Sequence, residues 1–280
     1  MKLISLIGNS QMLDAGAMFG NAPKALWSRW TEVDELNRMH IACRCLLAKD
    51  FNGQNVLCET GIGAFFEPKL KQRFGVNEES HILLDSLAEH GLTHEDIDIV
   101  VLSHLHFDHA GGLLSAWQEG KDSELLFPNA QFLVSTDHWQ RAKNPHPRDR
   151  ASFLPELNKL LVDSKRMHLV TGNNHELLPG VFFEYTNGHT PGMMHTIIED
   201  IVFCADLIPG KAWMHVPISM GYDRFPELLI DEKAQFLNSH LKANHRLFFT
   251  HDPDYAVANI EIIKGRFNTK DEIKKLNQEF

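Results

Sequence analysis

The sequence has few of the features that would place it among disulfide-rich, membrane-spanning or nucleic-acid-binding proteins. Only four cysteines occur in 280 residues, and their irregular positions (43, 45, 58 and 204) exclude a disulfide scaffold. The apolar segment at 1–7 is too short for a signal-peptide core or a spanning helix, so we expect a cytoplasmic protein with no membrane partner. No basic run is present, and 27 basic against 37 acidic side chains leave a net charge of −10, which disfavours nucleic acid as a partner.

The chain is long enough to bury a substantial core, and its apolar and charged fractions are those of an ordinary globular protein. It contains no tandem repeat, no low-complexity segment and no obvious linker. We therefore expect one domain over residues 1–280.

Apolar runs and helical periodicity predict a mixed α/β architecture. Strand-like runs lie near 2–7, 41–48, 54–58, 97–103, 131–135, 166–170, 181–186, 195–205 and 246–250. Helical patterns cover 79–90, 153–162 and 226–241, the last with Ile230, Ala234, Leu237 and Leu241 predicted on its apolar face. Because strands come in pairs and threes instead of alternating strictly with helices, two packed sheets with helices outside are favoured over a single doubly wound sheet.

Four potential metal ligands lie within six positions directly after the apolar run 97–102. They are His104, His106, Asp108 and His109. In a loop that leaves a buried strand, these side chains can converge, whereas a regular strand would send Asp108 and His109 to opposite faces. Imidazole nitrogen combined with a carboxylate suits zinc and, less selectively, iron, cobalt or manganese. The cluster therefore predicts a metal site, in preference to a histidine-rich surface loop.

Three further candidate ligands each follow an apolar run in the C-terminal half. His189 comes after the run at 181–186, Asp206 after 201–205, and His251 after 246–250. Any one of them alone could be a turn residue, but together with the 104–109 cluster they predict a shared site. Of the twelve remaining histidines, His195 is expected at a strand start or beside the ligands. The others are expected on the surface or at helix ends, among them His81, His90, His94, His138, His168 and His240.

The ordered set of the 104–109 loop followed by His189, Asp206 and His251 resembles the metallo-β-lactamase superfamily, and the resemblance spans essentially the whole chain. It implies an αββα sandwich of two packed mixed β-sheets flanked by helices, with two divalent ions at one edge. It also implies that His104, His106 and His189 bind the first metal, that Asp108, His109 and His251 bind the second, and that Asp206 bridges both. The metals implied are zinc first, with iron, cobalt or manganese as alternatives.

A narrower resemblance comes from the segments at 14–27 and 221–226, which are similar to those of the N-acyl homoserine lactonases of the Bacillus type and the methyl parathion hydrolases. Two departures stand out. Where the family strand motif reads Asp-x-Gly, this chain has Glu59-Thr60-Gly61. Where the best-known lactonases carry a phenol, three residues beyond the bridging aspartate, this chain has Pro209.

The resemblance implies a hydrolase that opens a lactone ring by attack of a hydroxide shared between two metal ions, because each ion lowers the pKa of the bound water. Asp108 is the candidate proton carrier, and Tyr222 the candidate for the missing phenol. An apolar wall for an acyl chain is expected from Met18, Phe19, Trp27, Phe107 and Trp213.

Several alternatives remain open at this point. The same chemistry suits a phosphotriesterase or arylesterase, and the same scaffold suits a non-catalytic metal-binding sensor. A nuclease is disfavoured by the net negative charge, and a glutathione-thioester hydrolase by the lack of a cationic clamp. A di-iron redox protein is disfavoured by His106, because the redox relatives carry glutamate at that position. The partner expected is a small-molecule substrate, and the lactonase resemblance implies a homodimer.

Overall fold

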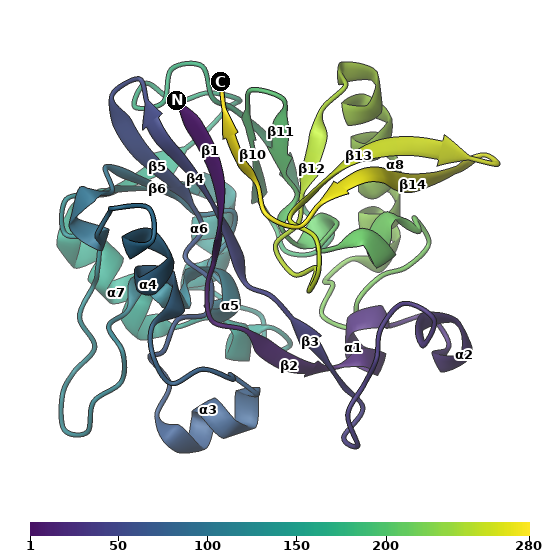
Figure 1. The fold of residues 1–280 in the computed structure, drawn as a ribbon. Helices are drawn as coiled ribbons and strands as arrows, with labels where there is room; N and C mark the ends of the chain where they lie inside the picture. Colours follow the sequence, from purple (N-terminus) through teal and green to yellow (C-terminus); the bar gives the residue numbers. More distant parts are fainter. The chain divides into compact units, whose positions relative to one another are not determined.

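The computed structural model describes all 280 residues, which form two compact units. The first unit contains Met1–Gln11, Ala42–Gly172 and Leu276–Phe280, and the second contains Met12–Ile41 and Asn173–Lys275. Each unit is built around one large β-sheet with its own helices (Figure 1). The prediction of one domain over 1–280 stays a prediction.

The first unit holds a seven-stranded mixed sheet in the order β15-β1-β4-β5-β6-β7-β8. Neighbours from β15 to β5 are antiparallel, and those from β5 to β8 are parallel. The strands are β1 (Lys2–Ile7), β4 (Arg44–Phe51), β5 (Gln54–Cys58), β6 (Ile99–Val101), β7 (Gln131–Ser135), β8 (Met167–Val170) and β15 (Asn277–Glu279). Since parallel strands end at the same edge, the segments after β5, β6 and β7 meet there.

Helices of the first unit cover this sheet through one apolar core. Leu83 and Leu87 of α4, Trp139 of α6, and Leu157 and Leu161 of α7 join strand residues in a single buried cluster. The helices are α3 (Pro68–Phe74), α4 (Ile82–Ala88), the single turn α5 (Phe107–Ala110), α6 (Thr136–Lys143) and α7 (Pro155–Ser164). Short 3₁₀ turns lie at η1 (His94–Asp96), η2 (Gly111–Leu113) and η3 (Arg150–Ser152).

The second unit holds a six-stranded sheet in the order β14-β13-β12-β11-β10-β9, in which only β11 and β12 are parallel. The strands are β9 (Phe182–Thr186), β10 (Met193–Ile198), β11 (Ile201–Phe203), β12 (Arg246–Phe248), β13 (Val257–Ile263) and β14 (Arg266–Ile273). A separate ribbon pairs β2 (Gln11–Asp14) with β3 (Arg38–Ile41). The helical segments are α1 (Ala15–Phe19), α2 (Lys24–Trp27), η4 (Ala205–Leu207), η5 (Lys211–Met214) and α8 (Pro226–Ala243).

The longest helix, α8, begins at Pro226 as predicted, but its buried face differs from the predicted one. The buried residues are Leu229, Lys233, Phe236, Leu237 and His240. Of the four predicted core positions only Leu237 is buried, and the other three are half-buried. Hydropathy alone misplaced the face because two of its members, a lysine and a histidine, are polar residues that hydropathy assigns to water.

The predicted α/β class, with two mixed sheets and flanking helices, is confirmed. One predicted run, 195–205, is two strands, because the chain reverses between β10 and β11 at Glu199, whose φ is 54°. The C-terminal strands β13, β14 and β15 were not predicted, since β14 and β15 are polar and mostly exposed or half-buried. No helix has both the length and the apolar character needed to cross a bilayer.

Candidate metal centre

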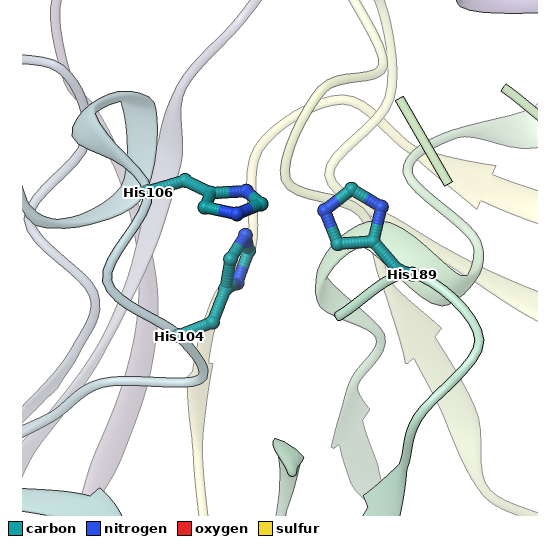
Figure 2. Close-up of side chains that lie close together, drawn as sticks. All are labelled: His104, His106 and His189. Atoms are coloured by element: carbon teal, nitrogen blue, oxygen red, sulfur yellow. The ribbon is translucent and has the colours of Figure 1, made fainter. Parts of the chain in front are cut away.

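The first unit brings the histidines of the 104–109 loop together at the end of β6. The imidazoles of His104 and His106 lie close to each other (Figure 2), with ring centroids 4.5 Å apart and ring planes at 79°. The ring centroids of His104 and His109 lie 3.9 Å apart. All three rings are buried, whereas Asp108 is half-buried with Oδ2 3.7 Å from Nε2 of His109. The turn α5 produces this convergence because it redirects the chain directly after His106.

One buried carboxylate, Glu59, orients two of these imidazoles. Its Oε2 lies 2.8 Å from Nδ1 of His109, and its Oε1 accepts the hydroxyl hydrogen of Ser103. The Ser103 oxygen in turn lies 2.8 Å from Nδ1 of His104, from which it accepts a hydrogen bond. Both Nδ1 atoms therefore carry the proton, and Nε2 becomes the coordinating atom of each ring. Glu59 follows β5, the neighbour of β6, and sequence reasoning noted it only as a departure from the family motif.

His138 is a second residue of this region that the sequence did not identify. Its Nε2 accepts the backbone N–H of Leu105 at 2.8 Å, between the two ligand candidates His104 and His106. The side chain is fully buried, and those of His81 and His240 are buried too. None of the three therefore lies on the surface, but each lies at a helix end, the other position predicted for them. His138 lies in the first turn of α6, where Ser135 caps the helix after β7. His138 follows β7, which is a parallel neighbour of β6, so its position in the sequence could have indicated that it lies near the ligand loop.

The second unit brings its three candidate ligands together around Asp206. Oδ2 of Asp206 lies 3.2 Å from Nε2 of His189, and Oδ1 lies 3.2 Å from Nε2 of His251. All three side chains are buried. Asp206 and His251 converge because β11 and β12 are parallel neighbours that end at the same edge. A carboxylate that presents one oxygen to each of two imidazoles has the arrangement of a bridging ligand.

A second carboxylate, Asp223, orients His189 from behind. Its Oδ1 lies 2.8 Å from Nδ1 of His189, and its Oδ2 accepts the N–H of Met220 at 2.6 Å. The loop that carries His189 is held by Glu232 of α8, which accepts the N–H groups of Asn187 and Gly188, each at 2.8 Å. Neither carboxylate was predicted, although Asp223 lies inside the 221–226 segment that the sequence had singled out.

A Cβ on Gly188 would stand only 2.4 Å from Cα of Leu229. The loop before His189 can therefore approach α8 only with glycine at this position. The close approach allows Glu232 to reach the two N–H groups.

The donor chemistry of each unit fits a divalent metal ion. Imidazoles whose Nδ1 atoms bond to a carboxylate or a hydroxyl, as those of His104, His109 and His189 do, are oriented to bind metal through Nε2. Nitrogen ligands with Asp108 and Asp206 suit zinc, and accept iron, cobalt or manganese.

The predicted substrate-binding residues fall into separate environments. Phe19 stacks on Trp213 at 4.8 Å and on Trp27 at 5.8 Å, and the indole N–H of Trp213 donates to the carbonyl of Met18. Phe19 and Trp213 line a cavity of about 400 Å³ in the second unit, whereas the buried Met18 and Trp27 do not. The remaining residue, Phe107, packs against Phe66 and Phe74 in the first unit.

Tyr222, the candidate phenol, is 42% exposed. It lies between Gly221 and Asp223 in the segment that leads to α8. Its role in binding or catalysis stays a prediction.

Strand-end imidazoles and carboxylates on two mixed sheets define a metal-binding α/β protein. Residues 42–251 match the model of the metallo-β-lactamase superfamily, and the chain belongs to that superfamily. It is 27% identical to an N-acyl homoserine lactonase from Bacillus thuringiensis over 197 residues, which cover 68% of each chain. A lactonase of the same name from Bacillus cereus is 26% identical over 235 residues, 77% of this chain and 83% of the relative.

Solved structures show the same fold. A probable metal-dependent hydrolase from Staphylococcus aureus is 29% identical with a TM-score of 0.86, over 97% of this chain and 96% of that chain. The dizinc quorum-quenching lactonase AidC, in complex with its product N-hexanoyl-L-homoserine, is 21% identical with a TM-score of 0.76, over 96% and 93%. The predicted metallo-β-lactamase fold is confirmed, and family and relatives together indicate a hydrolase.

Proposed function

We propose that this protein is a dinuclear metal-dependent hydrolase that opens the lactone ring of N-acyl homoserine lactones. The observation that carries the proposal is the Asp206 carboxylate, which offers one oxygen toward His189 and the other toward His251. The relatives named as N-acyl homoserine lactonases support the choice of substrate.

The proposed ligand set consists of the seven ligand candidates predicted from the sequence. His104, His106 and His189 would hold one ion, Asp108, His109 and His251 would hold the other, and Asp206 would serve both. The set is supported by the imidazole cluster at 104–109, by the carboxylates behind His109 and His189, and by the dizinc centre named for a structural relative. Zinc is the metal we propose.

Two divalent ions at these ligands would lower the pKa of a water molecule and polarise the substrate carbonyl. Hydrolysis adds one water across the ester bond of the ring: its hydroxyl joins the carbonyl carbon, the C–O bond breaks, and the ring oxygen gains the proton. Asp108 is the group that moves this proton. Its half-buried carboxylate is accessible from water and lies beside the ligand candidate His109.

The chain's other site residues hold the ligands still during this reaction. Glu59 and Asp223 fix the protons of His109 and His189 on Nδ1, which keeps each Nε2 directed to the metal. We further propose that Tyr222 donates a hydrogen bond to the substrate. Apolar contacts to the acyl chain would come from the predicted wall of Met18, Phe19, Trp27, Phe107 and Trp213.

The direct test is turnover of an acyl homoserine lactone by metal-reconstituted protein, followed as acid release. We expect ring opening well above the metal-free background, and loss of it in His106→Ala and Asp206→Ala. Absence of ring opening in the metal-replete protein would contradict the proposal. Faster turnover of an aryl phosphotriester or aryl ester in the same panel would favour the esterase alternative.

Metal content separates an enzyme from a sensor with a vestigial site. We expect about two ions per chain by elemental analysis after metal-replete expression. Fewer than about one ion would favour the sensor. The homodimer and the cytoplasmic location stay predictions, and light scattering on the purified protein tests the first of them.

A further inference from the structure

Helix α8 buries a lysine that the proposed chemistry does not use. Lys233 has no exposed surface and is the only lysine among the buried residues of the chain. Its Nζ donates a hydrogen bond to the carbonyl of Ile218 at 2.6 Å. Because a buried ammonium group is costly unless it is hydrogen-bonded and close to negative charge, its retention at this position calls for a compensating role.

The segment that Lys233 holds leads directly to Asp223. Ile218, Met220 and Asp223 are all buried, although Met220 to Asp223 form no helix or strand. The N–H of Met220 donates to Oδ2 of Asp223, whose Oδ1 faces His189. Only one residue, Ser219, therefore separates Ile218, whose carbonyl Lys233 binds, from Met220, whose N–H orients the Asp223 carboxylate.

The same helix holds the other side of His189. One residue before Lys233, Glu232 accepts the N–H groups of Asn187 and Gly188. Adjacent side chains of α8 thus bind two segments, one that carries His189 and one that carries its carboxylate partner.

We propose that Lys233 is a positioning residue for His189, which fixes the 218–223 segment so that the Asp223 carboxylate meets the imidazole before a metal binds. The proposal rests on His189 being a metal ligand, as proposed above. It assigns to α8 the task of pre-organising one ligand of the site from outside the ligand set.

Electrostatics agree with this role. Burial lowers the pKa of Lys233 to about 8, and the nearby Asp223 carboxylate acts in the opposite direction. The ammonium form therefore still predominates at neutral pH. Its positive charge is attracted to the Asp223 carboxylate, which helps to hold the two side chains in place.

The test compares three variants of the full-length protein. Lys233→Met keeps the length of the aliphatic stem and removes the charge and the donor. Lys242→Met removes one positive charge from an exposed position on the same helix. Phe236→Leu shortens an apolar side chain on the same buried face, where it packs against His195 and His240. It controls for loss of stability alone.

Two readouts separate positioning from general stability. The first is the affinity of the protein for each of the two zinc ions, measured by competition with a chromophoric chelator. The second is hydrogen exchange of the Met220 amide in metal-free protein. In Lys233→Met we expect the affinity for the more weakly bound zinc ion to fall about tenfold. This is the loss typical when a residue that hydrogen-bonds to a metal ligand is removed. Met220 should then exchange faster, whereas both controls should keep the wild-type affinity and Met220 protection.

Unchanged zinc affinity in Lys233→Met would overturn the proposal, as would an equal loss in Phe236→Leu. A wild-type protein that binds two zinc ions without opening lactones would refute the proposed substrate and leave the Lys233 proposal intact. A wild-type protein that binds no zinc would refute both.

Discussion

Oε2 of Glu59 lies 2.8 Å from Nδ1 of His109. Through Ser103 the same carboxylate also reaches Nδ1 of His104, so one buried acid sets the proton positions of two proposed ligands. Glu59 has a φ of 64°, a left-handed conformation that is rare outside glycine. This glutamate stands where the family motif has aspartate, and its longer side chain serves both histidines here.

Replacing Glu59 by glutamine should weaken metal binding. A neutral amide can still accept from His109, but it no longer raises the basicity of the imidazole, and its NH₂ group cannot accept from Ser103. We expect zinc affinity to fall by about 10 to 100-fold, measured by chelator competition. Glu89→Gln, at an exposed position, is the matched control. Wild-type affinity in Glu59→Gln would show that the carboxylate charge does not matter.

Replacing His138 by leucine should impair the ligand loop without removing a ligand. The N–H of Leu105 would lose its acceptor in a buried place, which costs about 1–3 kcal/mol of stability. We expect a lower melting temperature. We also expect a lower kcat with little change in KM, because the change disturbs the ligand loop at 104–109 and leaves the substrate contacts intact. His40→Leu, on an exposed residue of β3, should do neither. Equal kcat values for the two variants would argue against a positioning role for His138.

Stability should decrease in acid because of His195. Burial is the main cause that lowers its pKa from 6.5 to about 4, so between these values the unfolded chain binds a proton that the folded chain excludes. Stability attributable to this histidine is complete above pH 6.5 and is lost as the pH falls toward 4, by up to about 1.4 kcal/mol per pH unit. The free energies of unfolding of wild type and His195→Gln, measured with urea across this pH range, should become more similar as the pH falls. A constant difference between the two free energies over this range would contradict the role of His195 in the acid sensitivity.

Removing the metal should destabilise the fold reversibly. Ligands that bind only the folded chain add stability in proportion to the logarithm of their concentration, about 2.7 kcal/mol at a hundredfold excess over Kd. A chelator should therefore lower the melting temperature, and zinc should restore it. Asp206→Ala should respond much less to either treatment. A chelator effect of wild-type size in that variant would exclude Asp206 as a ligand.

Much of the fold could be predicted because β1, β5 and β7 each contain a short, mostly apolar segment with clear ends. Prediction failed where burial did not follow hydropathy. The polar strand β14 pairs with β13 although most of its side chains are exposed or half-buried. The buried face of α8 includes Lys233 and His240. A local pattern cannot reveal the burial of Lys233, because the carbonyl that it binds belongs to Ile218, outside the helix.

The sequence by itself determined the ligand candidates and the family. The spacing of the ligand candidates within the 104–109 loop depends on local chain geometry. His189, Asp206 and His251 each follow a strand that could be predicted from its apolar run. Only the tertiary structure decided which other side chains hold the ligands. The contacts by which Glu59, His138, Asp223 and Lys233 act join residues 15 to 50 positions apart in the sequence. Strand pairing and helix docking create these contacts, so no local pattern marks them in advance.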